Sequence, residues 1–221
     1  MIPVTVLSAR VIANASEALR SALKIPPGYH SLALLSTDCD DATYIALDEA
    51  TKKAHVEVVY GRSLYAGAAN ASTRLAGEVI GVLAGSDPTE VRSGLRAALD
   101  LLGRIGFEEA NEAGDVVYLA HCVPSTGTYL SQQAGVRPGT AIAYLIAPPV
   151  EALEALDAAL KMADVKLGAF FAPPTETNFA GALLTGSQSA CEAACRAFAQ
   201  RVRQIAEKPK DTEGLWNWTE T

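Results

Sequence analysis

Residues 46–56 read ALDEATKKAHV and residues 155–165 read ALDAALKMADV, with seven of eleven positions identical at an offset of 109. A Pro-Gly pair precedes the apolar runs SLALLS and AIAYLIA in the two copies, and a Gly-Ser pair closes AGEVIGVLAGS and FAGALLTGS. Because three anchors recur in the same order, the sequence predicts two copies of one unit of roughly 110 residues.

Each copy shows alternating strand and helix patterns. In the first copy we expect helices over 16–23, 41–54 and 88–102, and strands over 10–13, 31–36, 56–60 and 76–84. In the second copy we expect the matching strands over 116–122, 141–147, 165–171 and 179–185, and the matching helices over 128–134, 150–163 and 189–205. No Gly-rich phosphate turn interrupts the pattern. We therefore expect an α/β (α+β) fold, with a small antiparallel or mixed sheet in each unit and helices on one face.

The polar stretch EEANEAGD marks the predicted boundary between the copies. It divides the chain into a first domain over residues 1–110 and a second over residues 111–207. Residues 208–221 are polar apart from Trp216 and Trp218, which predicts a flexible tail.

The composition excludes several classes of protein. The chain has 221 residues with 25 acidic and 18 basic side chains, a net charge of −7 and a pI near 5.0. This charge argues against nucleic acid as a partner, because nucleic-acid binding requires a clustered basic surface. Hydrophobic residues make up 49% and charged residues 19%, which excludes a disordered chain and suggests that further surface is buried between copies.

The sequence gives no sign of membrane association or of an oxidising compartment. No apolar run approaches the ~20 residues of a membrane-spanning helix, and the N-terminus lacks a signal-peptide pattern. The four cysteines lack a CxxC spacing, which favours a reduced, cytoplasmic protein. Cys191 and Cys195 are four positions apart on a predicted helix, where they are either core side chains or a metal or redox pair.

No catalytic motif is evident. GxSxG, HExxH, GxGxxG and GxxxxGK[ST] are absent, and His30, His55 and His121 are isolated in the sequence. We therefore expect a protein that is not an enzyme. A structural protein and a small-molecule sensor or binding module both remain open.

The repeated ALDxAxKxA helix, followed by a strand, a second strand ending in Gly-Ser and a helix, resembles the bacterial microcompartment shell domain. The longer segments DCDDATYIALDEATKKA and APPTETNFAGALLTGSQSAC are similar to the tandem-domain shell proteins of ethanolamine utilisation. This resemblance implies a tandem duplication of a ferredoxin-like, circularly permuted domain. It also implies a homotrimer that imitates a hexagonal tile, packs beside other microcompartment shell proteins and lies in the shell. No cofactor is expected, although passage or binding of cobalamin is open.

Acidic residues at the start of the first Ala-rich helix have no counterpart in the second copy. Asp40 and Asp41 correspond to Pro149 and Val150 at an offset of 109. Helix capping is one explanation, and a site for a cation is the other. Glu78 likewise interrupts an apolar strand where the second copy has a phenylalanine. The resemblance implies small pores that bind ethanolamine through Asp40, Asp41, Glu78, Phe107 and Thr177.

The connection between the strands at 56–60 and 76–84 is eight residues longer than its counterpart, because the offset falls from 109 to 101. It is either an unstructured loop or a functional one. The resemblance implies a gate at a central pore, formed by residues 61–77 and including Tyr65, Gly67 and Ala68.

The repeated lysines, Lys52 and Lys161, match the tile-edge lysine of the family. Their alternative role is an i,i+4 ion pair with Asp48 and Asp157 on an exposed helix face.

Overall fold

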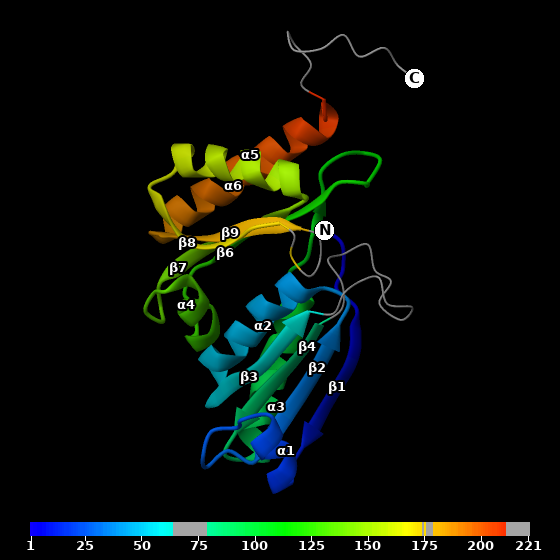
Figure 1. The fold of residues 1–221 in the computed structure, drawn as a ribbon, viewed down its shortest axis with the longest axis vertical. Helices are drawn as coiled ribbons and strands as arrows, with labels where there is room; N and C mark the ends of the chain where they lie inside the picture. Colours follow the sequence, from blue (N-terminus) through cyan, green and yellow to red (C-terminus); the bar gives the residue numbers. More distant parts are fainter. Residues whose placement is uncertain (64–78, 174, 176–178, 211–221) are drawn as a thin grey trace.

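The computed structural model describes residues 1–63, 79–173, 175 and 179–210. It contains two antiparallel sheets with six helices around them in the described parts of the chain (Figure 1). The first sheet has the strand order β1-β2-β4-β3 and the second β5-β6-β7-β9-β8. The strands are β1 (Val6–Ile12), β2 (Ser31–Thr37), β3 (Val56–Ser63), β4 (Val79–Gly85), β5 (Glu108–Glu109), β6 (Val117–Val123), β7 (Ala141–Ala147), β8 (Val165–Phe171) and β9 (Ala180–Gly186). The helices are α1 (Glu17–Ala22), α2 (Asp40–Lys53), α3 (Pro88–Leu102), α4 (Thr128–Ala134), α5 (Pro149–Met162) and α6 (Gln188–Glu207).

The α+β duplication predicted from the repeat is confirmed, since the two copies have the same order of elements and equivalent strand pairings. Ser31 of β2 pairs with Gly85, and Ala141 of β7 pairs with Gly186. Two strands are longer than the sequence predicts. β1 begins at Val6 because it pairs with β2 almost along its full length, and β3 continues to Ser63 because it pairs with β4 as far as Val79.

Small residues and a side-chain cap explain how the main helices form and pack. Ala46 and Ala50 of α2 are fully buried, as are Ala155 and Ala159 of α5, so both helices approach their sheets closely. The Asp87 carboxylate accepts hydrogen bonds from the backbone N–H groups of the first turn of α3, and Pro88 begins the helix.

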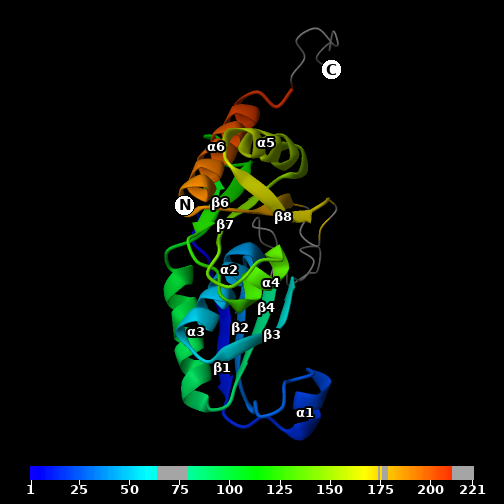
Figure 2. The same ribbon diagram turned by 90° about the vertical axis from the view of Figure 1, so that its left-hand side faces the viewer.

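The expectation that all helices lie on one face of their sheet is wrong for α4. Helices α2 and α3 pack on one face of the first sheet, and α5 and α6 pack on one face of the second. The other face of the second sheet contacts α2 and α4 (Figure 2). The side chains of β7 alternate between the two faces of the second sheet. Ala143 and Leu145 face α5 and α6, and Ile142, Tyr144 and Ile146 face α2. The largest core cluster therefore joins the two units.

The other face of the first sheet has no such cover. A small cluster there contains Leu32, Val82 and Ala84, and it packs against side chains such as Leu23 and Ile25 from the segment that includes α1. Helix α1 itself has no buried residue. The two sheets are thus covered unequally within one chain.

The junction between the units depends on α2. The Asp48 carboxylate is fully buried and accepts hydrogen bonds from the backbone nitrogens of Gly127 and Leu130, at 2.7 and 2.8 Å, at the start of α4. One turn later, the Thr51 hydroxyl accepts a hydrogen bond from the backbone nitrogen of Thr128 at 3.0 Å. Each of these bonds satisfies a donor that a helix N-terminus leaves without an intrahelical partner.

Candidate ligand-binding site

A small cavity of about 140 Å³ lies at this junction, at the N-terminal end of α2. Both units contribute to its wall. Its described lining residues are Asp40, Asp41, Tyr44, Ser63, Gln133, Tyr144, Ile146, Phe171, Thr175, Phe179 and Ala180. A cavity of this size has room for a molecule as large as benzene, so a small ligand would fit it.

Two carboxyl groups, Asp40 and Asp41, line the cavity and are almost completely buried, with 4% and 6% of their surface exposed. The Ser63 hydroxyl donates a hydrogen bond to Asp40 Oδ2 at 2.6 Å, and the Asp41 backbone N–H donates to Asp40 Oδ1 at 2.9 Å. The Ser63 hydroxyl also lies 2.7 Å from the Tyr44 hydroxyl. Asp41 Oδ1 accepts a hydrogen bond from the Tyr144 hydroxyl at 2.8 Å.

Burial changes the acid–base properties of this cluster. It raises the pKa of Asp40 to about 6, against the opposing effect of the Ser63 hydrogen bond. The pKa of Asp41 is raised well above its ordinary value, first by burial and then by the neighbouring Asp40 charge. Burial also raises the pKa of the Tyr144 hydroxyl, which therefore stays neutral and acts as a donor. A cation entering the cavity would relieve the cost of ionising these carboxyl groups.

Aromatic rings form the opposite wall. Phe171 and Phe179 line the cavity, and the Phe171 ring centroid lies 6.3 Å from that of Tyr144. Phe107, which the resemblance implied as a ligand residue, is fully buried and is not among the lining residues. It contacts Phe179 edge to face, with ring centroids 5.6 Å apart. In the single chain Phe107 therefore supports the aromatic wall from behind.

Several predicted residues lie outside the part of the chain that the structure describes. Glu78 and Thr177 are among them, as are the gate residues Tyr65, Gly67 and Ala68. Their roles stay predictions. Of the neighbouring residues, Thr175 lines the cavity, and its hydroxyl donates a hydrogen bond to the Phe179 carbonyl at 2.7 Å.

Three polar residues of the site, Tyr44, Ser63 and Tyr144, were not predicted from the sequence. The comparison between the copies contained a signal for each. Their counterparts in the other copy, at offsets of 109 and 110, are Leu153, Ala172 and Leu34. A polar group present in one copy and replaced by an apolar one in the other is the same pattern that singled out the two aspartates.

The repeated lysines occupy different surroundings. Lys52 Nζ donates a hydrogen bond to the Ser125 carbonyl of the second unit at 2.9 Å and also pairs with Glu49. Lys161 Nζ lies on the exposed side of α5, 2.5 Å from an Asp157 carboxylate oxygen. The i,i+4 alternative therefore describes Lys161, while Lys52 contacts the other unit.

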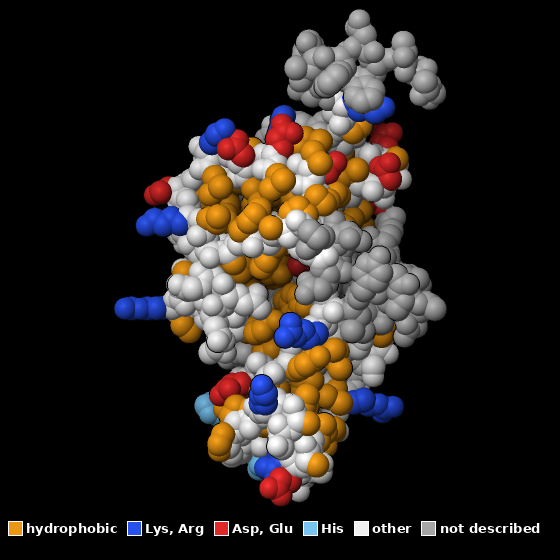
Figure 3. Space-filling view, viewed as in Figure 1, with side chains coloured by type: hydrophobic (Ala, Val, Ile, Leu, Met, Phe, Trp, Pro, Cys, Tyr) orange, Lys and Arg blue, Asp and Glu red, His pale blue; other side chains and the backbone are white. Residues whose placement is uncertain are grey.

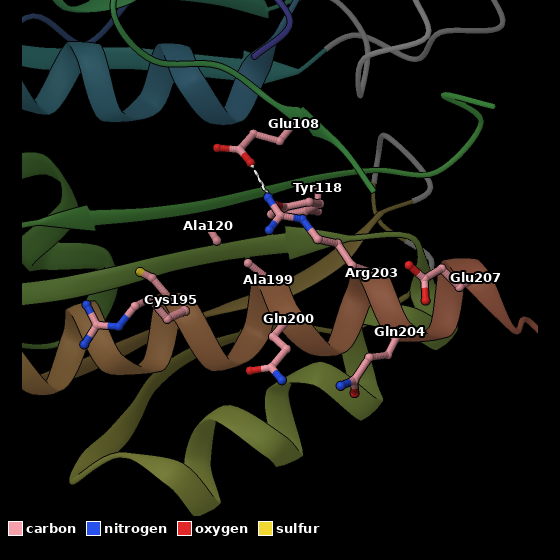
Figure 4. A pocket seen from close by; sticks show the side chains of 10 residues that line it. Glu108, Tyr118, Ala120, Cys195, Ala199, Gln200, Arg203, Gln204 and Glu207 are labelled. Carbon is pink, nitrogen blue, oxygen red and sulfur yellow. Dashed lines mark hydrogen bonds and ion pairs between the residues drawn. The ribbon is translucent and has the colours of Figure 1, made fainter. Parts of the chain in front are cut away.

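A larger hollow of about 580 Å³ lies between β6 and α6 (Figure 4). Two of its charges are paired with each other, because Arg203 forms an ion pair with Glu108 at 2.8 Å and lies over the Tyr118 ring. Cys195 also lines this hollow. Among the described residues, no group of three or more His, Cys, Asp or Glu side chains is arranged to hold a metal ion.

Apolar side chains gather on the surface over α5 and over the first sheet (Figure 3). Val150, Leu153 and Leu160 of α5 are 69%, 47% and 38% exposed. Within the described residues, none of the helices has the length and apolar character needed to cross a membrane.

Comparison with known proteins identifies relatives over nearly the whole chain. The BMC domain family matches residues 31–116. The bacterial microcompartment shell protein EutL of Clostridium perfringens is 62% identical over 205 residues, which cover 92% of this chain and 94% of that protein. EutL of Escherichia coli is 53% identical over 206 residues, covering 93% and 94% of the two chains.

Solved structures agree with the sequence relatives. A crystal structure of EutL from Clostridium perfringens superposes with a TM-score of 0.91 at 60% identity, covering 96% of this chain and 97% of that one. The ethanolamine utilization protein EutL from Leptotrichia buccalis gives a TM-score of 0.91 at 55% identity, covering 95% and 97%. A trimeric shell protein, PduB, shares the fold with a TM-score of 0.75 at 20% identity, covering 92% and 89%.

Proposed function

The chain belongs to the bacterial microcompartment shell proteins that carry BMC domains, and from this membership we propose that it forms a homotrimeric tile in the shell of an ethanolamine-utilisation microcompartment. Its role is structural, in a family of shell proteins and not of enzymes. In the proposal, other shell proteins surround the tile, small pores bind ethanolamine, and a central pore is gated. The proposed domains are residues 1–110 and 111–207, followed by a tail over residues 208–221.

The unequal cover of the repeated helices supports assembly from several copies. Four positions of α2 contact the second unit, namely Asp41, Tyr44, Asp48 and Thr51. The same positions of α5 are exposed in the single chain, namely Val150, Leu153, Asp157 and Leu160. Three of these four side chains on α5 are apolar, and such a surface gains free energy when a partner covers it.

The chain also contains the complementary surface. Within the chain, α2 is covered by the second sheet and α4. On the equivalent face of the first sheet, Leu32 and Val82 are buried under the segment with α1, but Leu34 and Val59 beside them are only partly buried. Helix α5 of one copy fits this face of the next copy as α2 fits the second sheet. This contact is head-to-tail and repeats until a ring closes. Three two-unit chains make a ring of six units, the outline of a hexagonal tile.

The observation that carries ligand binding is the buried carboxylate pair of the cavity. Ethanolamine is an ammonium ion at neutral pH, so the Asp40 carboxylate would pair with its charged end. The faces of Phe171 and Phe179 would add cation–π attraction, and Ser63 or Thr175 would serve its hydroxyl group. Glu78 and Thr177 complete the proposed ligand set, with Phe107 behind the aromatic wall.

The proposed gate, residues 61–77, includes Ser63, a residue of the cavity. Ser63, the last residue of β3, donates a hydrogen bond to Asp40, and residues 64–78 follow it in the chain. A ligand at Asp40 would change the Ser63 hydrogen bond and so act on the start of the gate. Lys52 and Lys161 are proposed to contact neighbouring tiles at the edges, and passage or binding of cobalamin stays open.

Sedimentation and calorimetry together test the proposed function. A shell tile should sediment as one species of three times 23.1 kDa, form two-dimensional sheets in electron micrographs and release or absorb heat on titration with ethanolamine. A small-molecule sensor outside a shell would bind the ligand without forming sheets. A monomer that neither forms sheets nor binds ethanolamine would refute the proposal.

A further inference from the structure

The two carboxyl groups of the cavity differ in their hydrogen-bond partners. Asp40 accepts hydrogen bonds from the Ser63 hydroxyl at 2.6 Å and from a backbone N–H at 2.9 Å. Asp41 accepts one from the Tyr144 hydroxyl at 2.8 Å, and a side-chain hydrogen bond with the adjacent Asp40 carboxyl group contributes to its raised pKa. Because hydrogen bonds stabilise the ionised form, Asp40 is the better of the two sites for a negative charge.

Among the described lining residues of the cavity, nothing basic compensates a second charge. The described residues that line the cavity include no Lys, Arg or His, and both aspartates are nearly completely buried. The titratable groups that face the pair are Tyr44 from α2 and Tyr144 from β7, and Cys39 precedes it in the chain. Burial raises the pKa of all three groups, so each remains neutral near pH 7. Two adjacent buried carboxyl groups without a cation cannot both ionise.

We propose that Asp41 is held as a neutral carboxylic acid that donates a hydrogen bond to the Asp40 carboxylate, so that the pair presents one negative charge, on Asp40, to the ammonium group of the ligand. Tyr144 is a positioning residue in this arrangement, because its hydroxyl occupies Asp41 Oδ1 and leaves the other oxygen to carry the proton. The inference rests on the proposed function, since it specifies which carboxyl group of the same cavity pairs with the ligand.

The geometry gives the two aspartates different substitution behaviour. Asparagine has the shape of a neutral carboxylic acid, with an oxygen that accepts from Tyr144 and an NH₂ group that donates to Asp40. Asp41→Asn therefore preserves the proposed arrangement. Asp40→Asn removes the charge that pairs with the ligand. The chain thus offers two chemically identical substitutions at adjacent positions, each a control for the other.

A ligand-free measurement tests the protonation state. In infrared difference spectra of the trimer near neutral pH, the wild-type protein should show a protonated carboxyl band that Asp41→Asn removes and Asp40→Asn retains. Melting curves establish that each variant is folded, and the band in the wild type can be followed with pH if a variant fails to fold. A wild-type spectrum with no protonated carboxyl band near neutral pH would overturn the inference.

Calorimetric titration tests the consequence for the ligand. Asp40→Asn should raise the ethanolamine Kd by more than about tenfold, and Asp41→Asn should raise it by a smaller factor, since the charge on Asp40 remains. Equal losses in the two variants would contradict the inference. Absence of ethanolamine binding by the wild type would instead count against the proposed function, and the infrared result would decide the inference alone.

Discussion

Helices α2 and α5 have the same repeated sequence but lie in different surroundings. α2 lies between its own sheet and the second unit, with Asp48 fully buried against the start of α4. Among the described residues, α5 packs within its own unit, on its sheet and on α6, and its Asp157, at the position of Asp48, is 61% exposed in its side chain. One copy of the junction is therefore completed inside the chain, and in the proposed tile a second chain completes the other.

The residues of the ligand cavity also differ between the two copies of the junction. Asp40 and Asp41 stand where α2 enters the completed junction, and Pro149 and Val150 stand at the equivalent place on α5. A tile of three chains would therefore carry carboxylate pairs at the junctions within chains, and apolar groups at the junctions between them.

The largest effect is expected from charged substitutions on the exposed side of α5. Leu153→Asp combined with Leu160→Asp should convert the trimer into folded monomers, because two carboxylates would be buried without partners in the contact between copies. Sedimentation velocity measures this as a fall from three times 23.1 kDa to 23.1 kDa. Ser93→Asp with Arg96→Asp, at exposed positions of α3, is the control and should leave the trimer intact. Trimers that survive the α5 substitutions would show that α5 is not the contact.

The next largest effect distinguishes Asp48 from Asp157, which occupy equivalent positions in α2 and α5. Asp48→Ala should lower the free energy of unfolding by about 3 kcal/mol, since it leaves two buried N–H groups of the α4 N-terminus without an acceptor. Asp157→Ala should leave the stability of the dissociated chain nearly unchanged and weaken the trimer. Denaturant melts at low protein concentration and dissociation measurements distinguish the two. Similar losses of chain stability for both variants would contradict the account.

Ligand binding should stabilise the protein by a smaller amount. Ethanolamine at about ten times its Kd adds about 1.4 kcal/mol to the free energy of unfolding, which corresponds to roughly 3–6 °C in Tm. Ethanol at the same concentration lacks the ammonium group and should give no shift. Asp40→Asn should remove most of the ethanolamine shift. A shift that persists in this variant would place the ligand elsewhere.

The buried acids also predict a pH dependence. The folded-state pKa of Asp40, about 6, lies above its ordinary value of 3.8, so the folded state binds more protons than the unfolded state between these values. The contribution of Asp40 to stability therefore falls as pH rises through this window. Asp87 has a lowered pKa and acts in the opposite direction, so the difference between wild type and Asp40→Asn is the quantity to measure. Relative to the wild type, the variant should gain Tm as pH rises from about 4 to about 6. A constant difference would show that Asp40 ionises normally.

The smallest effects on folding are expected at the lysines. Lys161→Ala removes one exposed ion pair and should change the free energy of unfolding by less than about 0.5 kcal/mol. Lys52→Ala also loses the hydrogen bond to the Ser125 carbonyl and should cost about 1 kcal/mol. Electron microscopy of both variants tests the edge role, for which loss of sheets with intact trimers is expected. Sheets that persist in both variants would remove the lysines from the tile edge.

Much of the fold could be predicted because the repeat made each half a check on the other. The ends of α3, α4, β7 and β8 agree with the sequence expectation, since a cap, a glycine or a proline marks them or strand pairing follows the apolar run. The longer β1 and β3 could not be predicted, because their extra residues are held by hydrogen bonds to neighbouring strands and carry no apolar alternation of their own.

The site was predicted in part for a similar reason. Asp40 and Asp41 were found because acids stand out against an apolar counterpart. Tyr144 was missed because a tyrosine in the run AIAYLIA is typical of a buried strand, and only the contact with Asp41 across 103 positions gives it a role. The position of α4 on the far face of its sheet also depends on contact between the units, which local periodicity does not contain.

The central claim is that the contact between chains repeats the contact within the chain. A structure of the assembled particle tests it at one atom pair, the Asp157 carboxylate of one copy and the backbone nitrogen of Leu19 in α1 of the next, which correspond to Asp48 and Leu130 at 2.8 Å. The account predicts a hydrogen bond there, with Leu153 and Leu160 buried against the first sheet of the neighbouring copy. An assembled particle in which Asp157 and the outer side of α5 face solvent would contradict it.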